Sequence, residues 1–465
     1  MITKHILALS TALAVLGSPA VALAQDGAVS MNEAIAAAVD SNPQIAQAQF
    51  NKEAIEQERS QAQGLFYPRV GLEASAGARR LDNATRKSLG IASHTLYPRD
   101  VEANLDWNLI DFGHKRGELL RQAARVDGAS LRVVERSEFI ALQVARQYLN
   151  VLLQQRILAA TQDNVSFHQS MANDLATGVK QGSISIADQQ QAQERLQAAI
   201  VRQTEAEESL AEAQNTLRTL TGLDIVAVHM PASYATNLPA NVDEAVGLAR
   251  THNPLVREAE ADLDAAHAQA KSAHSDLYPT IGVDASGRYG NDIDGFEGHT
   301  NDIQGRVYMR WTVFDGGINR GKYQEMVRRE SEARYKLYEV QRQAEEDVRT
   351  AMSNYKNQTR ILDDLGTESK VSDDLLLSYR SQFNVGRRSL LDVLDSQNSR
   401  YNVQVRLETA RFSQLFAQYQ ALAATNRFLV ALGQAPGAGA GAKDRERFHY
   451  GPPAPSETEY RHLPK

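Results

Sequence analysis

Repetition within the sequence limits the folds open to this chain more than any other feature. Asn-Pro and Tyr-Pro steps each occur twice at an offset of 211 residues, at 42–43 and 253–254 and at 67–68 and 278–279. The segment 107–113, Trp-Asn-Leu-Ile-Asp-Phe-Gly, returns at 311–317 as Trp-Thr-Val-Phe-Asp-Gly-Gly, at an offset of 204. Such ordered agreement predicts a tandem duplication, so one structural unit is built twice along the chain.

For each unit, the sequence predicts a helical stretch, then two strands, then a long helical hairpin. The helical stretches, 30–65 and 241–277, end at the Tyr-Pro steps, because proline disfavours α geometry in the residue before it. Four segments alternate in the manner typical of membrane β-strands: 69–77, 101–109, 280–289 and 303–313. Very long helices follow over 114–177 and 318–384. Helices of this length need partners along their length, which predicts coiled-coil packing.

Four strands cannot close a barrel in lipid, where an open sheet edge leaves backbone groups without partners. Known membrane barrels need at least about eight strands. Three copies of the chain, related by cyclic symmetry, would together supply about twelve. We therefore predict a mixed α/β membrane protein: a homotrimeric channel-tunnel with a shared 12-strand β-barrel and a long α-helical coiled-coil barrel.

The two ends of the chain carry separate signals. Residues 1–24 combine a basic start, an apolar run and small residues at Ala22 and Ala24, as a secretory signal peptide does. Residues 434–465 open with Gly-Ala repeats and end in a charged, proline-rich segment, which predicts a flexible tail. We therefore divide the chain into a signal peptide (1–24), a first repeat (25–222), a second repeat (223–433) and the tail (434–465).

Composition and motifs argue against catalysis. The chain has no cysteine, and its 11 histidines show no H-E-x-x-H spacing. It contains no G-x-S-x-G, and its glycine-rich tail lacks the Lys-Ser/Thr of a P-loop. We therefore expect no enzyme activity, no cofactor and no metal. A net charge of −7, from 50 basic and 57 acidic residues, argues against a nucleic-acid partner.

Several features occur together: the duplication, the signal peptide, the Tyr-Pro steps, the Trp…Asp-x-Gly hairpin ends and the turn Val-Gly-x-x-Ser-Leu-Leu-Asp-Val-Leu-Asp at 385–395. Together they resemble the TolC family of outer-membrane efflux proteins. The resemblance implies a homotrimer in the lipid of the cell outer membrane, with its helical tunnel in the periplasm. It also implies a periplasmic adaptor (membrane fusion) protein and an inner-membrane transporter, ABC or proton-driven, as partners. Residues 138–150 look most similar to the type I secretion branch.

Two aspartates beyond the second turn are candidate entrance residues. Asp392 and Asp395 lie three apart and so on one helical face. In a trimer they would form two stacked rings of carboxylates, which attract cations and repel anions. By resemblance they match the family's periplasmic entrance rings. The alternative is that Asp392 only complements the dipole of its own helix.

The resemblance also implies a gate latch. Arg388 matches a basic residue that ties neighbouring helices together, and Asp188 and Ala187 match its partners on the first turn. Phe383 stands where the best-known gate of the family has a tyrosine, so no hydroxyl is present there to bond Asp188. The alternative is an ordinary surface salt bridge between Arg388 and Asp188, worth about 0–1 kcal/mol.

Glycines and tryptophans mark the two ends of the predicted tunnel. Gly182 and Gly386 lie in the turns between the long helices, and by resemblance these tips dock the adaptor. The turns also need glycine for positive φ. Trp107 and Trp311 lie near strand ends and are expected in an interfacial aromatic belt.

One other class of protein fits the long helices and the signal peptide. A periplasmic coiled-coil scaffold or adaptor without a pore would contain both, but it does not explain the four duplicated strand segments. The favoured function is passive conduction of substrate, from an inner-membrane transporter to the outside, in a tripartite efflux or type I secretion system. Whether the substrate is a polypeptide or a small molecule stays open at this point.

Overall fold

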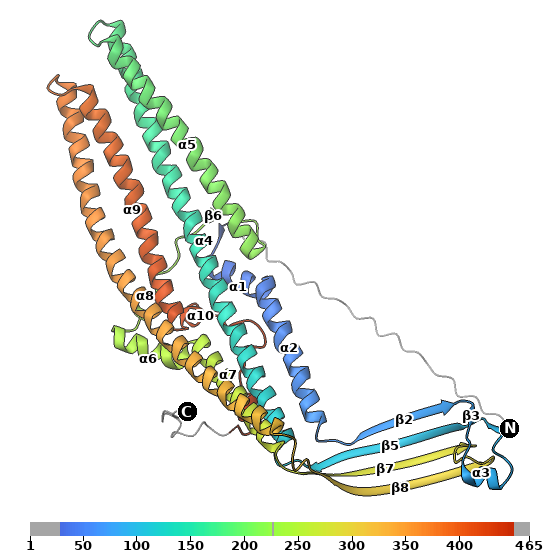
Figure 1. The fold of residues 1–465 in the computed structure, drawn as a ribbon. Coiled ribbons are helices and arrows are strands. Elements are labelled where there is room, and N and C mark those ends of the chain that lie inside the picture. The colour runs from blue at the N-terminus through green and yellow to red at the C-terminus, as the bar shows by residue number, and fades with distance from the viewer. Residues whose placement is uncertain (1–27, 226, 451–465) are drawn as a thin grey trace, which may run out of the picture.

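The structure, a computed structural model, describes residues 28–225 and 227–450. Two long helical hairpins run side by side, and a four-stranded sheet extends from the end opposite their tips (Figure 1). The signal peptide expected at 1–24 lies outside the described residues. None of the described helices is both long enough and apolar enough to cross a membrane.

The duplication appears as two matching sets of elements. The first set is α1 (Met31–Ser41), α2 (Pro43–Gly64), β2 (Arg69–Ala76), β5 (Arg99–Ile110), α4 (His114–Lys180) and α5 (Ile186–Thr221). The second set is α6 (Val242–His252), α7 (Pro254–Ser275), β7 (Thr280–Asn291), β8 (His299–Arg310), α8 (Ile318–Asn384) and α9 (Leu390–Ala424). The shorter elements are β1 (Ala28–Val29), β3 (Arg79–Arg80), α3 (Ala84–Ser88), β4 (Thr95–Leu96), β6 (Ala227–Val228), η1 (Ala235–Asn237), α10 (Phe428–Ala431) and α11 (Asp444–Arg447).

The helical stretch that opens each repeat is two helices rather than the single one expected. The backbone leaves helical geometry at Asn42 and at Asn253. Each asparagine side chain accepts a hydrogen bond of 2.9 Å from a backbone N–H two residues later. Proline then occupies the first helical position, where no intrahelical bond is lost. The recurring Asn-Pro step is therefore the start signal of α2 and α7.

The sheet joins the two repeats. Its antiparallel strands follow the order β2-β5-β7-β8, so β5 of the first repeat pairs with β7 of the second. Within the described residues, β2 and β8 each pair on one side only. β8 begins at His299 and ends at Arg310, earlier than the 303–313 predicted from the sequence, and Trp311 therefore lies just beyond the strand.

The Asp-x-Gly motifs fix the start of the long helices. The carboxylate of Asp111 accepts hydrogen bonds from the backbone N–H groups of Gly113 (3.2 Å) and Lys115 (3.0 Å). The carboxylate of Asp315 accepts the equivalent bonds from Gly317 and Asn319, both 2.9 Å. The two glycines have φ of 109° and 90°, which side chains with a Cβ rarely adopt. The strand-to-helix corner is thus built identically in both repeats.

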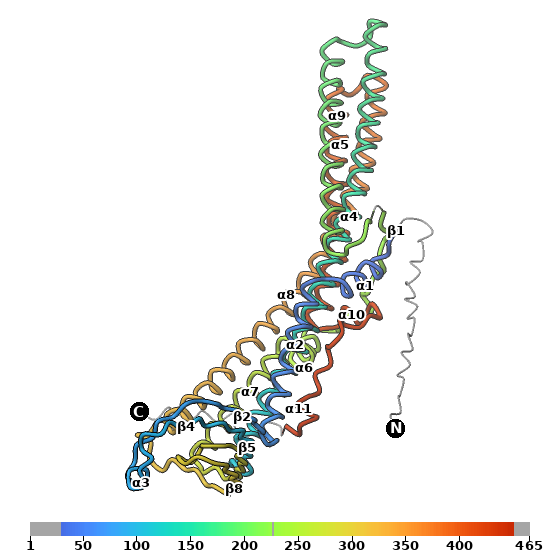
Figure 2. The backbone as a smooth tube through the Cα atoms, turned by 90° about the vertical axis from the view of Figure 1, so that its right-hand side faces the viewer, coloured from blue at the N-terminus to red at the C-terminus, as the bar shows by residue number. Residues whose placement is uncertain are grey.

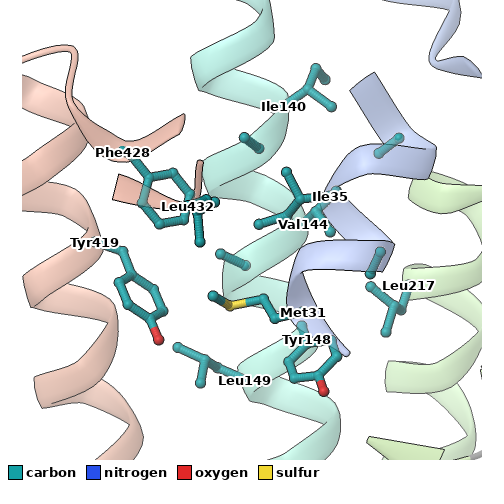
Figure 3. Packing of buried hydrophobic residues seen from close by; sticks show 14 of the residues in the cluster. Met31, Ile35, Ile140, Val144, Tyr148, Leu149, Leu217, Tyr419, Phe428 and Leu432 are labelled. Atoms are coloured by element: carbon teal, nitrogen blue, oxygen red, sulfur yellow. The ribbon is translucent and has the colours of Figure 1, made fainter. Parts of the chain in front are cut away.

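The largest hydrophobic core lies midway along α4, where α1, α5, α9 and α10 pack around it (Figure 3). At its centre the Tyr148 hydroxyl lies 2.8 Å from the carbonyl oxygen of Val29 and accepts a 2.8 Å bond from the backbone N–H of His229. Near this level the helices change direction, so that the hairpins and the sheet-proximal part form an angle (Figure 2). A smaller core lies near the hairpin tips.

The tail expected to be flexible is packed over residues 434–450. Asp127, only 2% exposed on α4, accepts hydrogen bonds from the backbone N–H groups of Asp444 (2.7 Å) and Arg445 (3.1 Å). The Arg445 guanidinium bridges the carboxylates of Asp127 (3.0 Å) and Asp264 (2.6 Å), which lie on α4 and α7. These contacts overturn the flexible assignment for this stretch, because its backbone and charged groups have fixed partners. Residues 451–465 lie outside the described part.

Candidate functional site

The four-stranded sheet has an apolar face, because side chains alternate along each strand and the strands are in register. Large apolar side chains on this face are exposed in the single chain: Val70, Leu72, Val101, Tyr289, Ile303, Val307 and Met309. No helix of the described chain covers them (Figure 1). Their chemistry suits contact with hydrocarbon.

The opposite face of the sheet is polar and carries two charged rows. Across the four strands, register aligns Arg69, Asp106, Asp284 and Arg306 in one row and Glu73, Glu102, Arg288 and Asp302 in another. Between them lies a row without charge, formed by Gly71, Asn104, Ser286 and Gln304. Arg306 Nε donates to Asp284 at 2.8 Å. This face is built to contact water.

The two tryptophans make equivalent contacts at the base of the sheet. Trp107 Nε1 donates to the carbonyl oxygen of Phe66 at 3.0 Å, and Trp311 Nε1 donates to that of Leu277 at 3.2 Å. Both acceptors directly precede a Tyr-Pro step. Trp107 and Trp311 stay 39% and 52% exposed as residues, with their indole N–H groups satisfied. This combination of a polar anchor and an exposed ring matches what an interfacial aromatic residue needs.

At the other end of the molecule, the hairpin tips share a hydrophobic core. It contains Leu175 of α4, Leu196 of α5 and Val393 of α9, and Phe383 packs against it from the end of α8. Gly182 and Gly386 both have φ of 71° and remain exposed at the tips. The turns thus use glycine for the same backbone conformation in both repeats.

Asp392 occupies the position that its dipole-complementing interpretation predicts. With Ser389 it forms a capping box at the start of α9, in which Ser389 Oγ lies 2.8 Å from the Asp392 carboxylate. Asp395 is exposed, and its carboxylate lies 3.7 Å from Arg195 Nη2 of α5. Both carboxylates reach the surface near the tip, so their capping and ion-pair contacts leave them accessible to solvent.

Within one chain, the structure does not bring Arg388 and Asp188 together. Arg388 lies over the ring of Tyr379, 4.1 Å from its centroid, and its Nη1 is 3.7 Å from the Asp392 carboxylate. The Asp188 carboxylate instead accepts a 2.7 Å hydrogen bond from Ser185. Ala187 is exposed beside it. A latch between Arg388 and Asp188 would therefore have to connect different copies of the chain.

A buried polar layer between the two hydrophobic cores was missed from the sequence. Gln397 Nε2 of α9 donates to Asn164 Oδ1 of α4 at 2.8 Å, and both side chains are almost fully buried. Nearby on α4, burial lowers the pKa of His168 to about 4. Thr161, Asn164 and His168 recur at helical spacing in an otherwise apolar stripe, and that break in the pattern was the available signal.

Comparison with known proteins supports this architecture. Residues 34–223 and 245–433 match the family described as outer membrane efflux protein. The toluene efflux pump outer membrane protein TtgF of Pseudomonas putida is 25% identical over 412 residues, 83% of this chain and 81% of the relative. Outer membrane protein TolC of Vibrio cholerae is 22% identical over 398 residues, 82% and 87% of the two chains.

Solved structures share the fold. A membrane protein from Pseudomonas aeruginosa aligns with a TM-score of 0.76 at 18% identity, over 88% of this chain and 91% of that one. Outer membrane protein VceC of Vibrio cholerae aligns with a TM-score of 0.73 at 18% identity, over 87% and 96%. These likenesses confirm the predicted mixed α/β channel-tunnel fold. Because both halves of the duplicated chain match the family, the protein belongs to the outer membrane efflux proteins, as an outer-membrane channel of the TolC type with its helical tunnel in the periplasm.

Proposed function

We propose that three copies of the chain form one conduit, which passively passes substrate from an inner-membrane transporter to the outside in a tripartite efflux or type I secretion system. The observation that carries this proposal is the four-stranded sheet, with a pairing edge on β2 and on β8, one apolar face and one charged face. Such a sheet satisfies its backbone in lipid only when copies close the edges. The charged rows would then line a water-filled lumen.

Two further partners complete the proposal. The exposed turns at Gly182 and Gly386 are the farthest points from the sheet and support docking of a periplasmic adaptor there (Figure 1). The driving energy would come from an inner-membrane transporter, ABC or proton-driven. The choice of substrate, polypeptide or small molecule, would then be made by that transporter.

Asp392 and Asp395 would act as entrance rings once three tips meet. Their exposure at the start of α9 supports this role, because a carboxylate must reach the lumen to select ions. The capping contact of Asp392 is compatible with it, since one oxygen can bond Ser389 while the charge remains. Arg388 and Asp188, which do not meet within one chain, would form the latch across neighbouring copies, beside Phe383.

Single-channel conductance in planar bilayers tests the proposal. Wild-type protein would be compared with the double variant Asp392→Ala/Asp395→Ala. A matched control is Glu205→Ala/Glu208→Ala, two exposed carboxylates with the same spacing on α5. The expected result is a small cation-selective conductance, blocked by divalent cations, in wild type and control but without that block in the double variant.

Each other outcome has a defined meaning. If conductance and its divalent-cation block are the same in both double variants as in wild type, the protein is still a channel, but Asp392 and Asp395 do not form the entrance rings. A correctly folded trimer without any conductance would instead support the alternative, a periplasmic scaffold or adaptor that lacks a pore. Fractionation adds an independent check, because a scaffold would not remain with the outer membrane.

A further inference from the structure

A pocket of about 540 Å³ lies where α4, α7, α8 and α9 meet, next to the main hydrophobic core. This volume is in the range of small-molecule sites. Its apolar walls include Phe139 and Leu142 of α4 and Leu255 of α7. Amide side chains, among them Asn354 and Gln420, supply polar contacts along the opposite wall. The pocket thus combines apolar surface with a few convergent polar groups.

All charged groups that line this pocket carry the same sign. Glu135 and Glu138 come from α4, and Glu346 and Asp347 come from α8. Among the described residues that line the pocket, none is a lysine or an arginine. The Glu135 carboxylate is 3.4 Å from its sequence neighbour Arg136, whose guanidinium lies over the Phe139 ring. The other three carboxylates of the lining have no basic residue beside them within the described lining, and such a group of negative charges attracts a cation.

Glu138 provides the second and independent observation. It is only 7% exposed, its Oε1 accepts a 3.3 Å hydrogen bond from the backbone N–H of Leu429, and its Oε2 has no hydrogen-bond partner among the described residues. A buried carboxylate oxygen normally has a partner. Asn426, also in the pocket lining, has a buried Oδ1 that likewise lacks a partner within 28–225 and 227–450. Both atoms are acceptors, so the group that would satisfy them is a donor or a cation.

The size of the pocket and the arrangement of the carboxylates favour an organic cation over a metal ion. No cluster of three or more His, Cys, Asp or Glu side chains within 28–225 and 227–450 could hold a metal. A metal site needs ligands gathered within about 2–3 Å of one point. An alkyl or aryl ammonium ion instead places one positive charge near Glu138 and packs its apolar body against Phe139 and Leu142.

We propose that the pocket lined by Glu138, Phe139 and Asp347 binds organic monocations with an apolar body. The site lies inside one chain, at the junction of both repeats, so binding there does not rest on the proposed conduction. Protons compete with the cation, because burial raises the pKa of Glu138 to about 7. With that value, apparent affinity falls about tenfold between pH 8.5 and pH 6.

Equilibrium binding to the full-length protein in detergent tests this site. The probe is benzyltrimethylammonium chloride, measured by displacement of the fluorescent cation ethidium. The matched neutral molecule, neopentylbenzene, has the same shape without the charge. We expect displacement by the ammonium ion only, and an affinity about tenfold or more lower in Glu138→Gln, the size of losing one desolvated charge contact. The pH dependence should disappear in the same variant.

Two further variants keep the test decisive. Glu346→Gln/Asp347→Asn changes only exposed carboxylates on the other wall, so it tests the pocket without disturbing buried groups, and it should weaken binding as well. Glu118→Gln is the matched control, a partly buried glutamate on α4 that lies outside the pocket lining and pairs with Arg121. It should leave binding unchanged.

Three results would overturn the proposal. One is equal binding of the neutral analogue, which would indicate simple apolar partition. Another is unchanged affinity in both pocket variants. The third is no binding of either cation together with a less stable trimer in Glu138→Gln, which would show that a basic side chain of a second copy fills the pocket. Conductance can be normal or absent in each case, so failure of this site is distinguishable from failure of the channel proposal.

Discussion

Replacing Arg445 by alanine should release the C-terminal segment from the helices. Its guanidinium bonds two carboxylates that are themselves buried, Asp127 at 3.0 Å and Asp264 at 2.6 Å. Removing one partner of a buried pair typically costs about 3–5 kcal/mol, because a charge is left uncompensated. The Arg445 side chain is 20% exposed, so the lower end applies, about 3 kcal/mol. Since about 1.36 kcal/mol corresponds to a factor of ten in an equilibrium constant, the equilibrium constant for local opening of this segment should rise by about two orders of magnitude.

The dependence of this loss on pH has a definite sign. Burial raises the pKa of Asp264, and the hydrogen bond and charge of Arg445 oppose that rise. Without Arg445 the pKa of Asp264 rises further above its unfolded value, so the folded state binds protons more readily than the unfolded state. Stability then falls as pH rises through that interval. The loss of stability in Arg445→Ala should therefore grow as pH rises through the range in which the Asp264 carboxyl loses its proton.

Native-state hydrogen exchange of the intact protein measures the effect directly. The reporters are the backbone amides of Asp444 and Arg445, which donate to Asp127 at 2.7 and 3.1 Å. Arg447→Ala is the control, because this arginine is exposed on the same short helix and contacts Phe448 rather than a carboxylate. Protection that changes less than threefold in Arg445→Ala, or equally in the control, would refute the reasoning.

Three more predictions follow from single contacts. In Gly386→Ala the new Cβ meets open space, but the residue must still hold φ at 71°. The tip between α8 and α9 should lose about 1–2 kcal/mol of local stability, so its amide hydrogens should exchange faster while those of the core are unchanged. Tyr148→Phe removes the acceptor of the partly buried hydrogen bond from the His229 N–H, so the detergent-solubilised protein should lose about 1 kcal/mol of stability and its thermal midpoint should fall; an unchanged midpoint contradicts this. The pKa of His168 is lowered to about 4, so stability is lost as pH falls below about 6.5. Amides of α4 near His168 should lose up to about 2 kcal/mol of protection between pH 7 and pH 5, and His168→Gln should abolish that loss.

The repeat was the part of the fold that the sequence predicted best. The Trp and Tyr-Pro positions that recur in the sequence make equivalent hydrogen bonds in the two repeats. Trp107 donates to the residue before the first Tyr-Pro step, Phe66, and Trp311 donates to the residue before the second, Leu277. Local chemistry determined these features, since proline, glycine and aspartate act on their own neighbours. Alternation likewise predicted the four strands. The bounds of β8 were predicted about three to four residues too late, because both ends of this strand depend on its pairing with β7.

The packed tail was predicted wrongly because composition was read as flexibility. A Cβ on Gly437 would lie 2.8 Å from Ile45 Cγ2 and 3.0 Å from Gln49 Nε2, so this glycine allows the chain to pass close to α2. Small residues serve close packing as well as linkers, and only tertiary structure separates the two. The pocket around Glu138 was missed for a related reason: its lining comes from helices far apart in the sequence.

The outer edges of β2 and β8, which pair with no other strand in the described part of the chain, also have a genetic consequence. Each chain in a closed ring must accept a neighbour on one edge and offer its other edge to the next, so a single defective edge breaks the whole ring. When equal amounts of intact and edge-defective chains mix at random in threes, only about one assembly in eight contains intact chains alone. Proline substitutions on β8 should therefore be dominant over the wild-type allele, whereas loss of the gene should be recessive.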